Sequence, residues 1–240
     1  MTTVDLRALS AGAGGSAALT GYFAQPSGSG RWPAIVVIHE AFGLDEAVRR
    51  HVERLAAMGY LSLAPDLFSD GGTRHCLAST MLAMTSGHGK AYADIAAARH
   101  WLLQRAGCTG KVGIVGFCMG GGFALMTLDT GFDVAAPNCG PLPGDLAAAL
   151  AGACPVVGSY GGQDRGLRGA ADKLAAALNE AGVLHDVKEY PAAGHSFLND
   201  AMSGPRLLRP LQKVLGMGPD PAAAADAWRR IEAFFAEQLA

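Results

Sequence analysis

The chain has little net charge and no broad region of one sign. Its 240 residues include 19 lysines and arginines and 21 aspartates and glutamates, which gives a formal net charge of -2 at pH 7. Nucleic acids and anionic membranes attract proteins through extended basic surfaces. Neither is therefore expected as a partner, and a small-molecule substrate is expected instead.

Signals for export, disulfides and membrane insertion are also lacking. The first 20 residues have no basic start followed by an apolar block, so the cytoplasm is the expected location. The five cysteines form no C-x-x-C pair, which argues against a disulfide framework or a compact zinc site. The long uncharged stretch 112–128 holds five glycines, and a strand, a sharp turn and a helix explain it better than a membrane span.

Apolar runs typical of buried parallel strands alternate with helical patterns along the chain. The runs lie at 33–40, 60–66, 111–117, 133–138 and 154–160, and the helical patterns at 45–58, 91–106, 119–129, 168–181 and 222–239. A further strand is expected at 185–191, before the last helix. This alternation predicts a single α/β domain over 1–240, with a mostly parallel doubly wound sheet and helices on both faces.

Three segments are predicted to lie outside this regular pattern. Residues 18–26 are expected to form an edge strand, preceded by a poorly ordered N-terminal segment at 1–18. Residues 67–90 and 199–220 fit no regular element. Long irregular connections in a compact domain are often functional, so these two are the candidate substrate-binding loops.

The stretch "VGIVGFCMGG" has the pattern of a nucleophile elbow. Gly116 and Gly120 flank Cys118, an apolar strand precedes them and a helix follows. The thiol would lie at a helix N-terminus, where the positive end of the dipole favours a thiolate. Because a free cysteine is otherwise most often a buried small residue, this interpretation depends on finding an acid and a base.

Two residues at later strand ends match the order nucleophile, acid, base. Asp164 follows the run at 154–160, and His195 follows the last strand in a loop that contains glycine. Asp133, Asp186 and His185 are set aside because they start strands, at the wrong end of a parallel sheet for catalysis. His51 and His100 lie within helices, where solvated positions are expected. Cys118, His195 and Asp164 are the predicted triad.

The sequence "VVIHEAFGL" ends the first of the parallel runs. A zinc-protease helix would need a second histidine at position 43, which is glycine, so no metal is expected. The backbone N–H of Ala41 lies where such folds complete an oxyanion hole with the N–H of Met119, and Glu40 is a carboxylate at the same sheet edge. No glycine motif matches a P-loop or a dinucleotide site, so no nucleotide cofactor is expected.

The motifs "HEAFGL", "APDLF", "GFCMGG", "GGQD" and "AGHSF" together resemble the dienelactone hydrolase (carboxymethylenebutenolidase) family of the α/β-hydrolase fold, from about Gly21 onward. The resemblance implies that Cys118 is the nucleophile, His195 the base and Asp164 the acid. It also implies that Glu40 contacts the resting thiol and helps to activate it when substrate binds. The implied reaction is hydrolysis of a lactone or small ester through an acyl-thioester, without a cofactor.

The chain departs from this family at one position. In family members, an arginine shortly after "GHSF" helps to hold the substrate carboxylate. Asn199 stands at about that position, and other arginines in or near loops are the alternatives: Arg74, Arg165, Arg168 and Arg206. Asn199, Arg74 and Phe42 are the candidate substrate-binding residues. Whether the protein is a monomer or a homodimer stays open.

Two other interpretations are weighed against this enzyme. The first is a redox-sensing or ligand-binding protein of the same fold, with a reactive thiol that does not turn over. The presence of both His195 and Asp164 weighs against it. The second, a serine esterase using Ser159 or Ser196, fails because neither serine lies in an elbow.

Overall fold

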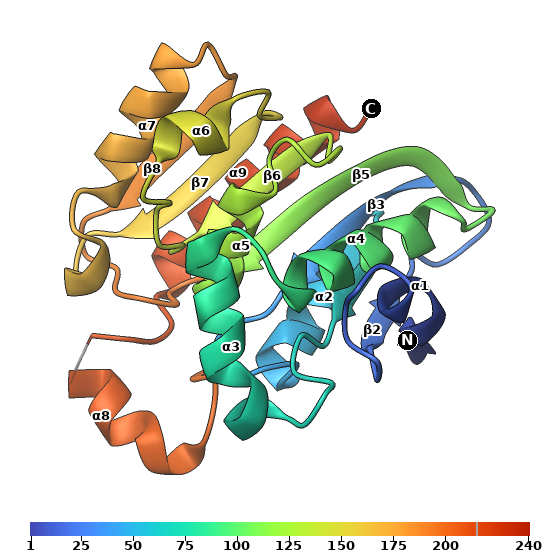
Figure 1. Cartoon of the computed structure of the whole chain (residues 1–240). Helices are drawn as coiled ribbons and strands as arrows, with labels where there is room; N and C mark the ends of the chain where they lie inside the picture. The colour runs from blue at the N-terminus through green and yellow to red at the C-terminus, as the bar shows by residue number, and fades with distance from the viewer. Residues whose placement is uncertain (215) are drawn as a thin grey trace.

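A central eight-stranded sheet organises the chain (Figure 1). The computed structural model describes residues 1–214 and 216–240. The strand order is β1-β2-β4-β3-β5-β6-β7-β8, with β1–β2 and β2–β4 antiparallel and all later pairs parallel. The strands are β1 (Thr2–Asp5), β2 (Thr20–Ala24), β3 (Trp32–Ile38), β4 (Leu61–Pro65), β5 (Cys108–Phe117), β6 (Val134–Asn138), β7 (Val156–Gly161) and β8 (His185–Tyr190).

Helices connect the strands and cover the sheet. The α-helices of the described residues are α1 (Arg7–Ala11), α2 (Glu46–Ala57), α3 (Thr73–Ser86), α4 (Lys90–Leu103), α5 (Met119–Met126), α6 (Leu146–Leu150), α7 (Ala170–Glu180), α8 (Arg209–Val214) and α9 (Pro221–Gln238). Two short 3-10 helices, η1 (Arg165–Leu167) and η2 (Arg206–Leu208), lie in loops.

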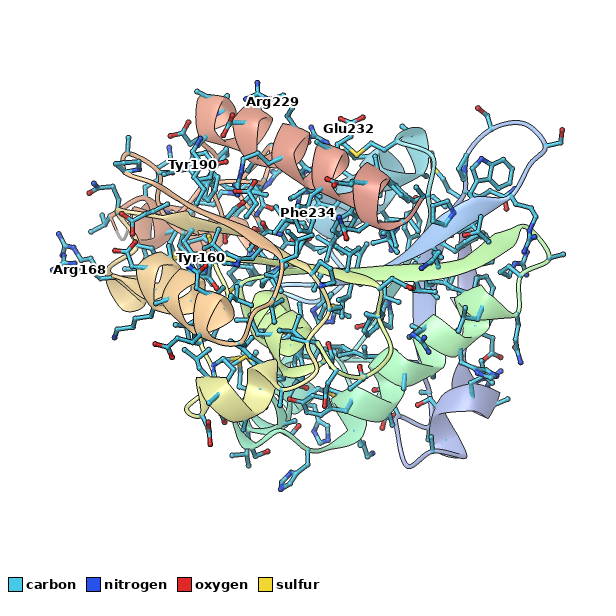
Figure 2. The ribbon with its side chains drawn as sticks, turned by 90° about the horizontal axis from the view of Figure 1, so that it is seen from above. Tyr160, Arg168, Tyr190, Arg229, Glu232 and Phe234 are labelled. Carbon is cyan, nitrogen blue, oxygen red and sulfur yellow. The ribbon has the colours of Figure 1, made fainter. Side chains whose placement is uncertain are left out.

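The two faces of the sheet bury separate apolar clusters. Along β3, Ile35 and Val37 belong to the cluster that also holds residues of α2 and α9, whereas Val36 and Ile38 belong to the cluster that holds residues of α3, α4, α5 and α7. Successive strand residues point to opposite faces, so a run that is apolar at every position needs helices on both sides. Figure 2 shows α9 on one side of the sheet and α4, α6 and α7 on the other, with Phe234 directed toward the sheet and Arg229 outward. The predicted α/β fold with helices on both faces is confirmed.

The N-terminal prediction is wrong, because residues 1–18 contain both β1 and α1. β1 pairs with β2 and is the sheet edge, so the strand predicted at 18–26 lies inside the sheet. Asp94, buried on α4, accepts hydrogen bonds from the Ser10 hydroxyl and from the N–H and hydroxyl of Ser16. A buried carboxylate needs such partners, and here they tie the N-terminal segment to α4.

Neither segment predicted to be irregular is wholly so. Most of 67–90 is helix α3, which buries Cys76, Thr80, Ala83 and Met84. These positions have helical spacing, but polar residues interrupt the apolar pattern, so the sequence does not indicate the helix clearly. Segment 199–220 contains η2 and α8. Among the helices of the described residues, none is both long and apolar enough to cross a membrane.

Candidate active site

Cys118 occupies a strained turn between β5 and α5. Its φ of 54° and ψ of -116° are unusual for a residue with a side chain. A Cβ on Gly116 would overlap the carbonyl oxygen of Gly120, and a Cβ on Gly120 would overlap that of Ile38. Both flanking positions therefore require glycine. The Cys118 thiol is partly exposed, whereas the other four cysteines are buried.

The structure brings the predicted acid and base together. Asp164 follows β7, is buried, and places Oδ2 2.5 Å from Nδ1 of His195. The N–H of Gly166 donates to the other carboxylate oxygen at 3.1 Å, which fixes the carboxylate plane. With Nδ1–H donated to Asp164, Nε2 of His195 is the ring nitrogen free to serve Cys118.

The surroundings of His195 act on its pKa in opposite directions. Burial lowers this pKa, but the hydrogen bond to Asp164 and the nearby Cys118 side chain outweigh burial and raise the pKa above its usual value. An imidazolium beside a cysteine sulfur is the arrangement by which proteins supply a thiolate nucleophile. Asp164 and His195 therefore form a hydrogen-bonded pair, and Cys118 is close enough to His195 to affect its pKa.

The loop after β3 is held by a buried histidine. The Nδ1–H of His39 donates to the carbonyl of Glu40 at 2.7 Å, and the N–H of Leu67 donates to its Nε2 at 3.1 Å. Burial lowers the pKa of His39, which agrees with this neutral tautomer. The N–H groups of Ala41 and Met119 have no hydrogen-bond acceptor within the described parts of the chain. An oxyanion hole requires N–H groups that are unpaired in this way.

The side chain of Glu40 is buried in a polar cluster. The Ser203 hydroxyl donates to Oε2 at 2.6 Å, and the Asn199 amide donates to Oε1 at 3.2 Å and to Ser203 Oγ at 2.9 Å. The resemblance implied that Glu40 contacts the resting thiol. Over residues 1–214 and 216–240, the hydrogen bonds of its carboxylate go to Asn199 and Ser203 instead.

The prediction that His51 is solvated is wrong. His51 is buried on α2, donates from Nε2 to the Asn199 side-chain oxygen at 2.8 Å, and stacks on Phe117 with ring centroids 4.3 Å apart. Burial lowers its pKa to about 4. Its position relative to Val48, Val52 and Leu55 on α2 would have placed it on the apolar face of that helix. His100 is exposed, as predicted.

The candidate substrate-binding residues lie in different surroundings. Asn199 is buried with its amide committed to Glu40, Ser203 and His51. Phe42 is half-buried against Gly204, whose Cβ would lie 2.6 Å from the Phe42 ring. Arg74 is exposed in the first turn of α3. Of the alternatives, Arg165, Arg168 and Arg206 are exposed, and Figure 2 shows Arg168 pointing away from the domain.

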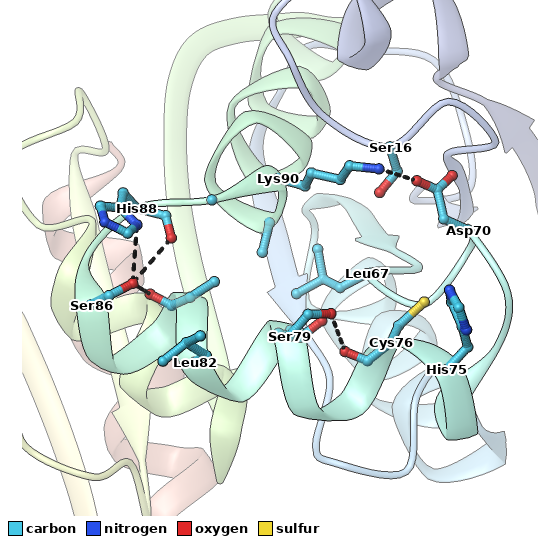
Figure 3. A pocket seen from close by; sticks show the side chains of 14 residues that line it. Ser16, Leu67, Asp70, His75, Cys76, Ser79, Leu82, Ser86, His88 and Lys90 are labelled. Atoms are coloured by element: carbon cyan, nitrogen blue, oxygen red, sulfur yellow. Dashed lines mark hydrogen bonds and ion pairs between the residues drawn. The ribbon is translucent and has the colours of Figure 1, made fainter.

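Two cavities border the segments predicted to bind substrate. One, of about 390 Å³, lies between α3 and the start of α4, with Cys76 and the 2.9 Å Lys90–Asp70 ion pair among its lining (Figure 3). None of Cys118, Asp164, His195 or Glu40 lines it. The other, of about 430 Å³, is lined by Phe42, Ser203 and Arg209 and lies beside the Glu40 cluster.

No group of three or more potential ligands that could hold a metal ion occurs among the described residues, which include His39 and Glu40. Neither residue is thus part of a metal-binding group here.

Comparisons with known proteins agree with the family that the sequence motifs indicate. The model of the dienelactone hydrolase family matches residues 19–239. A protein of Methylorubrum extorquens named "Putative carboxymethylenebutenolidase" is 30% identical over 232 residues, which cover 89% of this chain and 75% of that protein. One of the same name from Salmonella typhimurium is 29% identical over 236 residues, covering 90% and 82%.

Solved structures share the architecture. A dienelactone hydrolase-like promiscuous phosphotriesterase from metagenomic libraries superposes with a TM-score of 0.78 at 25% identity, covering 92% of this chain and 93% of that one. For a Klebsiella pneumoniae protein titled "Putative Dienelactone Hydrolase" the TM-score is 0.73 at 24% identity, with 91% and 92% covered. This chain therefore belongs to the dienelactone hydrolase family and is an α/β-hydrolase that acts on carboxylic ester bonds.

Proposed function

We propose that the protein hydrolyses a lactone or small ester through a Cys118–His195–Asp164 triad and an acyl-thioester intermediate. One observation carries the proposal. The Nδ1 atom of His195 lies 2.5 Å from the buried carboxylate of Asp164, and the Cys118 side chain in the elbow is among the groups that raise the pKa of this histidine. Membership of the family supplies the reaction class, and this set supplies the nucleophile, the base and the group that orients the base.

The reaction proceeds in two halves. The Cys118 sulfur attacks the carbonyl carbon, and the N–H groups of Ala41 and Met119 stabilise the resulting oxyanion. The carbon–oxygen bond to the alcohol then breaks, and protonated His195 gives its proton to the departing oxygen. In the second half, His195 takes a proton from water, the hydroxide attacks the thioester, and the Cys118 thiolate is released with the acid product.

The remaining parts of the proposal follow from this chemistry. Ester hydrolysis consumes only water, so no cofactor takes part in the proposed steps. A small-molecule lactone or ester is the proposed partner, rather than nucleic acid or membrane. The cytoplasm is the proposed location because all five cysteines are free, and thiols stay reduced in that compartment.

The proposal is tested by steady-state hydrolysis of 4-nitrophenyl esters and of simple and unsaturated lactones. Turnover is expected for the wild type and for the control Cys76→Ala, whose thiol lies outside the triad, and is expected to vanish in Cys118→Ala. His195→Ala distinguishes the enzyme from the redox-sensing alternative. An enzyme should lose its turnover in this variant, whereas a sensor shows no turnover in the wild type and should keep a Cys118 thiol that can be modified. Hydrolysis that persists in Cys118→Ala would rule the proposal out.

A further inference from the structure

Asn138 is the last residue of β6 and lies beside the nucleophile elbow. β5 and β6 are parallel neighbours in the sheet (Figure 1), and Phe117 pairs with Asn138 at their carboxyl ends. Asn138 is only 1% exposed, although its side chain carries a polar amide. Burying such a group is costly unless it forms hydrogen bonds, so its partners indicate what it does there.

Two groups of Asn138 hold the elbow, one at Cys118 and one just before it. The N–H of Cys118 donates to the backbone carbonyl of Asn138 at 2.9 Å. The Asn138 side-chain amide donates to the carbonyl of Gly116 at 3.3 Å, and to that of Ala136 on its own strand at 3.0 Å. One residue therefore holds the backbone of the elbow at two points.

The elbow needs such support because its central residue is strained. Cys118 has a φ of 54°, in the left-handed region that residues with a side chain rarely adopt. A strained backbone persists only where its surroundings determine it, and otherwise it relaxes toward an ordinary conformation. Relaxation at Cys118 would turn the thiol away from its present direction, and the hydrogen bonds of Asn138 oppose this change.

The other end of the Asn138 amide makes no such contribution. Its Oδ1 atom is buried and accepts no hydrogen bond from any residue in 1–214 or 216–240. A buried acceptor without a partner lowers stability. Leucine has a similar size and removes this unfavourable oxygen together with the NH2 donor. Asn138→Leu therefore helps to separate an effect on the elbow from an effect on stability.

The residue after Asn138 adjoins the loop of the base. Burial raises the pKa of the Cys139 thiol to about 11, and nearby His195 opposes this rise. In the parts of the chain that the structure describes, the residues other than glycine with positive φ are Cys118, Cys139 and Ser196. Strain of this kind is typical of functional sites. Asn138 thus lies between the turn of the nucleophile and the loop of the base.

We propose that Asn138 is a positioning residue for the nucleophile, whose backbone carbonyl and side-chain amide hold the Cys118 turn so that the thiol stays directed at His195. The inference rests on the proposed function and adds a residue that acts through Cys118 rather than on the substrate. Loss of the side-chain hydrogen bonds leaves the backbone carbonyl in place, so the elbow should form but hold Cys118 less firmly. Small displacements of reacting groups have large effects on rate.

Asn138→Leu and Asn138→Ala test this inference with two readouts. For both variants we expect kcat for a 4-nitrophenyl ester to fall at least about ten-fold with little change in KM. Alkylation of Cys118 by iodoacetamide, followed by peptide mass spectrometry, should also slow at least about ten-fold near pH 6. The reason is that a thiol displaced from His195 loses the interaction that stabilises its thiolate. A role in stability alone would lower the melting temperature and leave the alkylation rate of the folded protein unchanged.

Val134→Ala is the matched control. Val134 lies on the same strand, is fully buried, and pairs with Gly113 of β5 at a distance from the elbow. The cavity left by the smaller side chain should lower the melting temperature, whereas kcat and the alkylation rate of Cys118 should stay at their wild-type values. If the Asn138 variants behave like Val134→Ala, the inference is overturned.

A measurement on the wild type keeps the inference testable if the Asn138 variants do not fold. In nuclear magnetic resonance spectra, the side-chain NH2 protons of Asn138 should exchange slowly with water and change chemical shift when Cys118 is alkylated. Exchange at the rate of an exposed asparagine, or no shift on alkylation, would contradict the proposed contact with the elbow.

The outcomes also separate this inference from the proposed function. If Cys118→Ala hydrolyses the ester as the wild type does, the triad itself is wrong. If hydrolysis depends on Cys118 but is unaffected in both Asn138 variants, the triad stands and only the role of Asn138 is wrong.

Discussion

Gly194 and Gly216 meet backbone to backbone, so that a Cβ on Gly194 would overlap the carbonyl oxygen of Gly216. The contact lies one residue before His195. Next to it, the N–H of Gly218 donates to the His195 carbonyl at 2.9 Å, and His195 pairs with Met217 as a parallel bridge. Part of segment 199–220 therefore supports the loop that carries His195, the proposed base.

Gly194→Ala is expected to displace this loop and lower kcat/KM by at least about ten-fold, because sub-ångström placement of a catalytic base matters to rate. Gly144→Ala is the matched control, since a Cβ there meets no atom within 4 Å. Steady-state kinetics and thermal unfolding of both variants check the prediction. A fully active Gly194→Ala would show that the contact is not needed to position His195.

Cys118→Ser is expected to fold like the wild type and to lose more than about 100-fold in kcat. A hydroxyl is a far weaker acid than a thiol, so the introduced alcohol stays protonated, whereas the thiol of Cys118 interacts with His195 strongly enough to raise the pKa of the imidazole. In the control Cys76→Ser, the hydroxyl can keep the bond to the Phe68 carbonyl and activity should remain. Near-wild-type turnover in Cys118→Ser would be inconsistent with a thiol-specific site.

Asp164→Asn is expected to lower kcat by roughly 10²–10⁴-fold with little change in fold. An asparagine does not stabilise the protonated imidazole and can reverse the ring tautomer, so that Nε2 no longer accepts a proton. Asp172→Asn, at an exposed position on α7, serves as the control. The two variants are compared by kcat and by circular dichroism, and equal activity would remove Asp164 from the triad.

His51 gives the fold a pH dependence of known sign. Its pKa is about 4 when folded and near 6.5 when unfolded, so below about pH 6.5 the unfolded chain binds a proton that the folded chain does not. The stability contributed by neutral His51 is present above that pH and is lost as the pH falls toward 4.

Between about pH 7.5 and pH 5 this loss should be about 2 kcal/mol in the free energy of unfolding. His51→Gln keeps a donor for Asn199 and does not titrate, so its stability should fall less over the same interval. Urea unfolding of both proteins at the two pH values measures the difference. Because His39 is buried in both proteins, its contribution cancels. Identical pH dependence would mean that His51 is not buried in neutral form.

The sequence predicts the parts of the fold that follow from local patterns. Buried strands such as β3 are apolar at nearly every position, and the nucleophile elbow is a motif of consecutive residues around Cys118. Asp164 and His195 could be found because parallel strands bring their carboxyl ends to one edge of the sheet. The hydrogen bond between them joins residues 31 positions apart in the sequence, and only the structure shows it.

The sequence does not predict the Glu40 cluster, because its members are brought together only by the fold. Ser203 and Glu40 are 163 residues apart, and no local pattern around Ser203 distinguishes it from a solvated serine. The sequence also does not predict that residues 1–18 are ordered, because hydrogen bonds to Asp94 on the distant helix α4 hold this segment in place. Tertiary hydrogen bonds of this kind leave no periodic signal.

The most direct test of the central claim is to quench the protein during hydrolysis of a chromogenic ester and to locate the acyl group by peptide mass spectrometry. The account predicts an acyl adduct on Cys118 that forms and decays at the rate of turnover and that accumulates when deacylation is slowed. Turnover with Cys118 unmodified throughout, or an adduct on another residue, would contradict it.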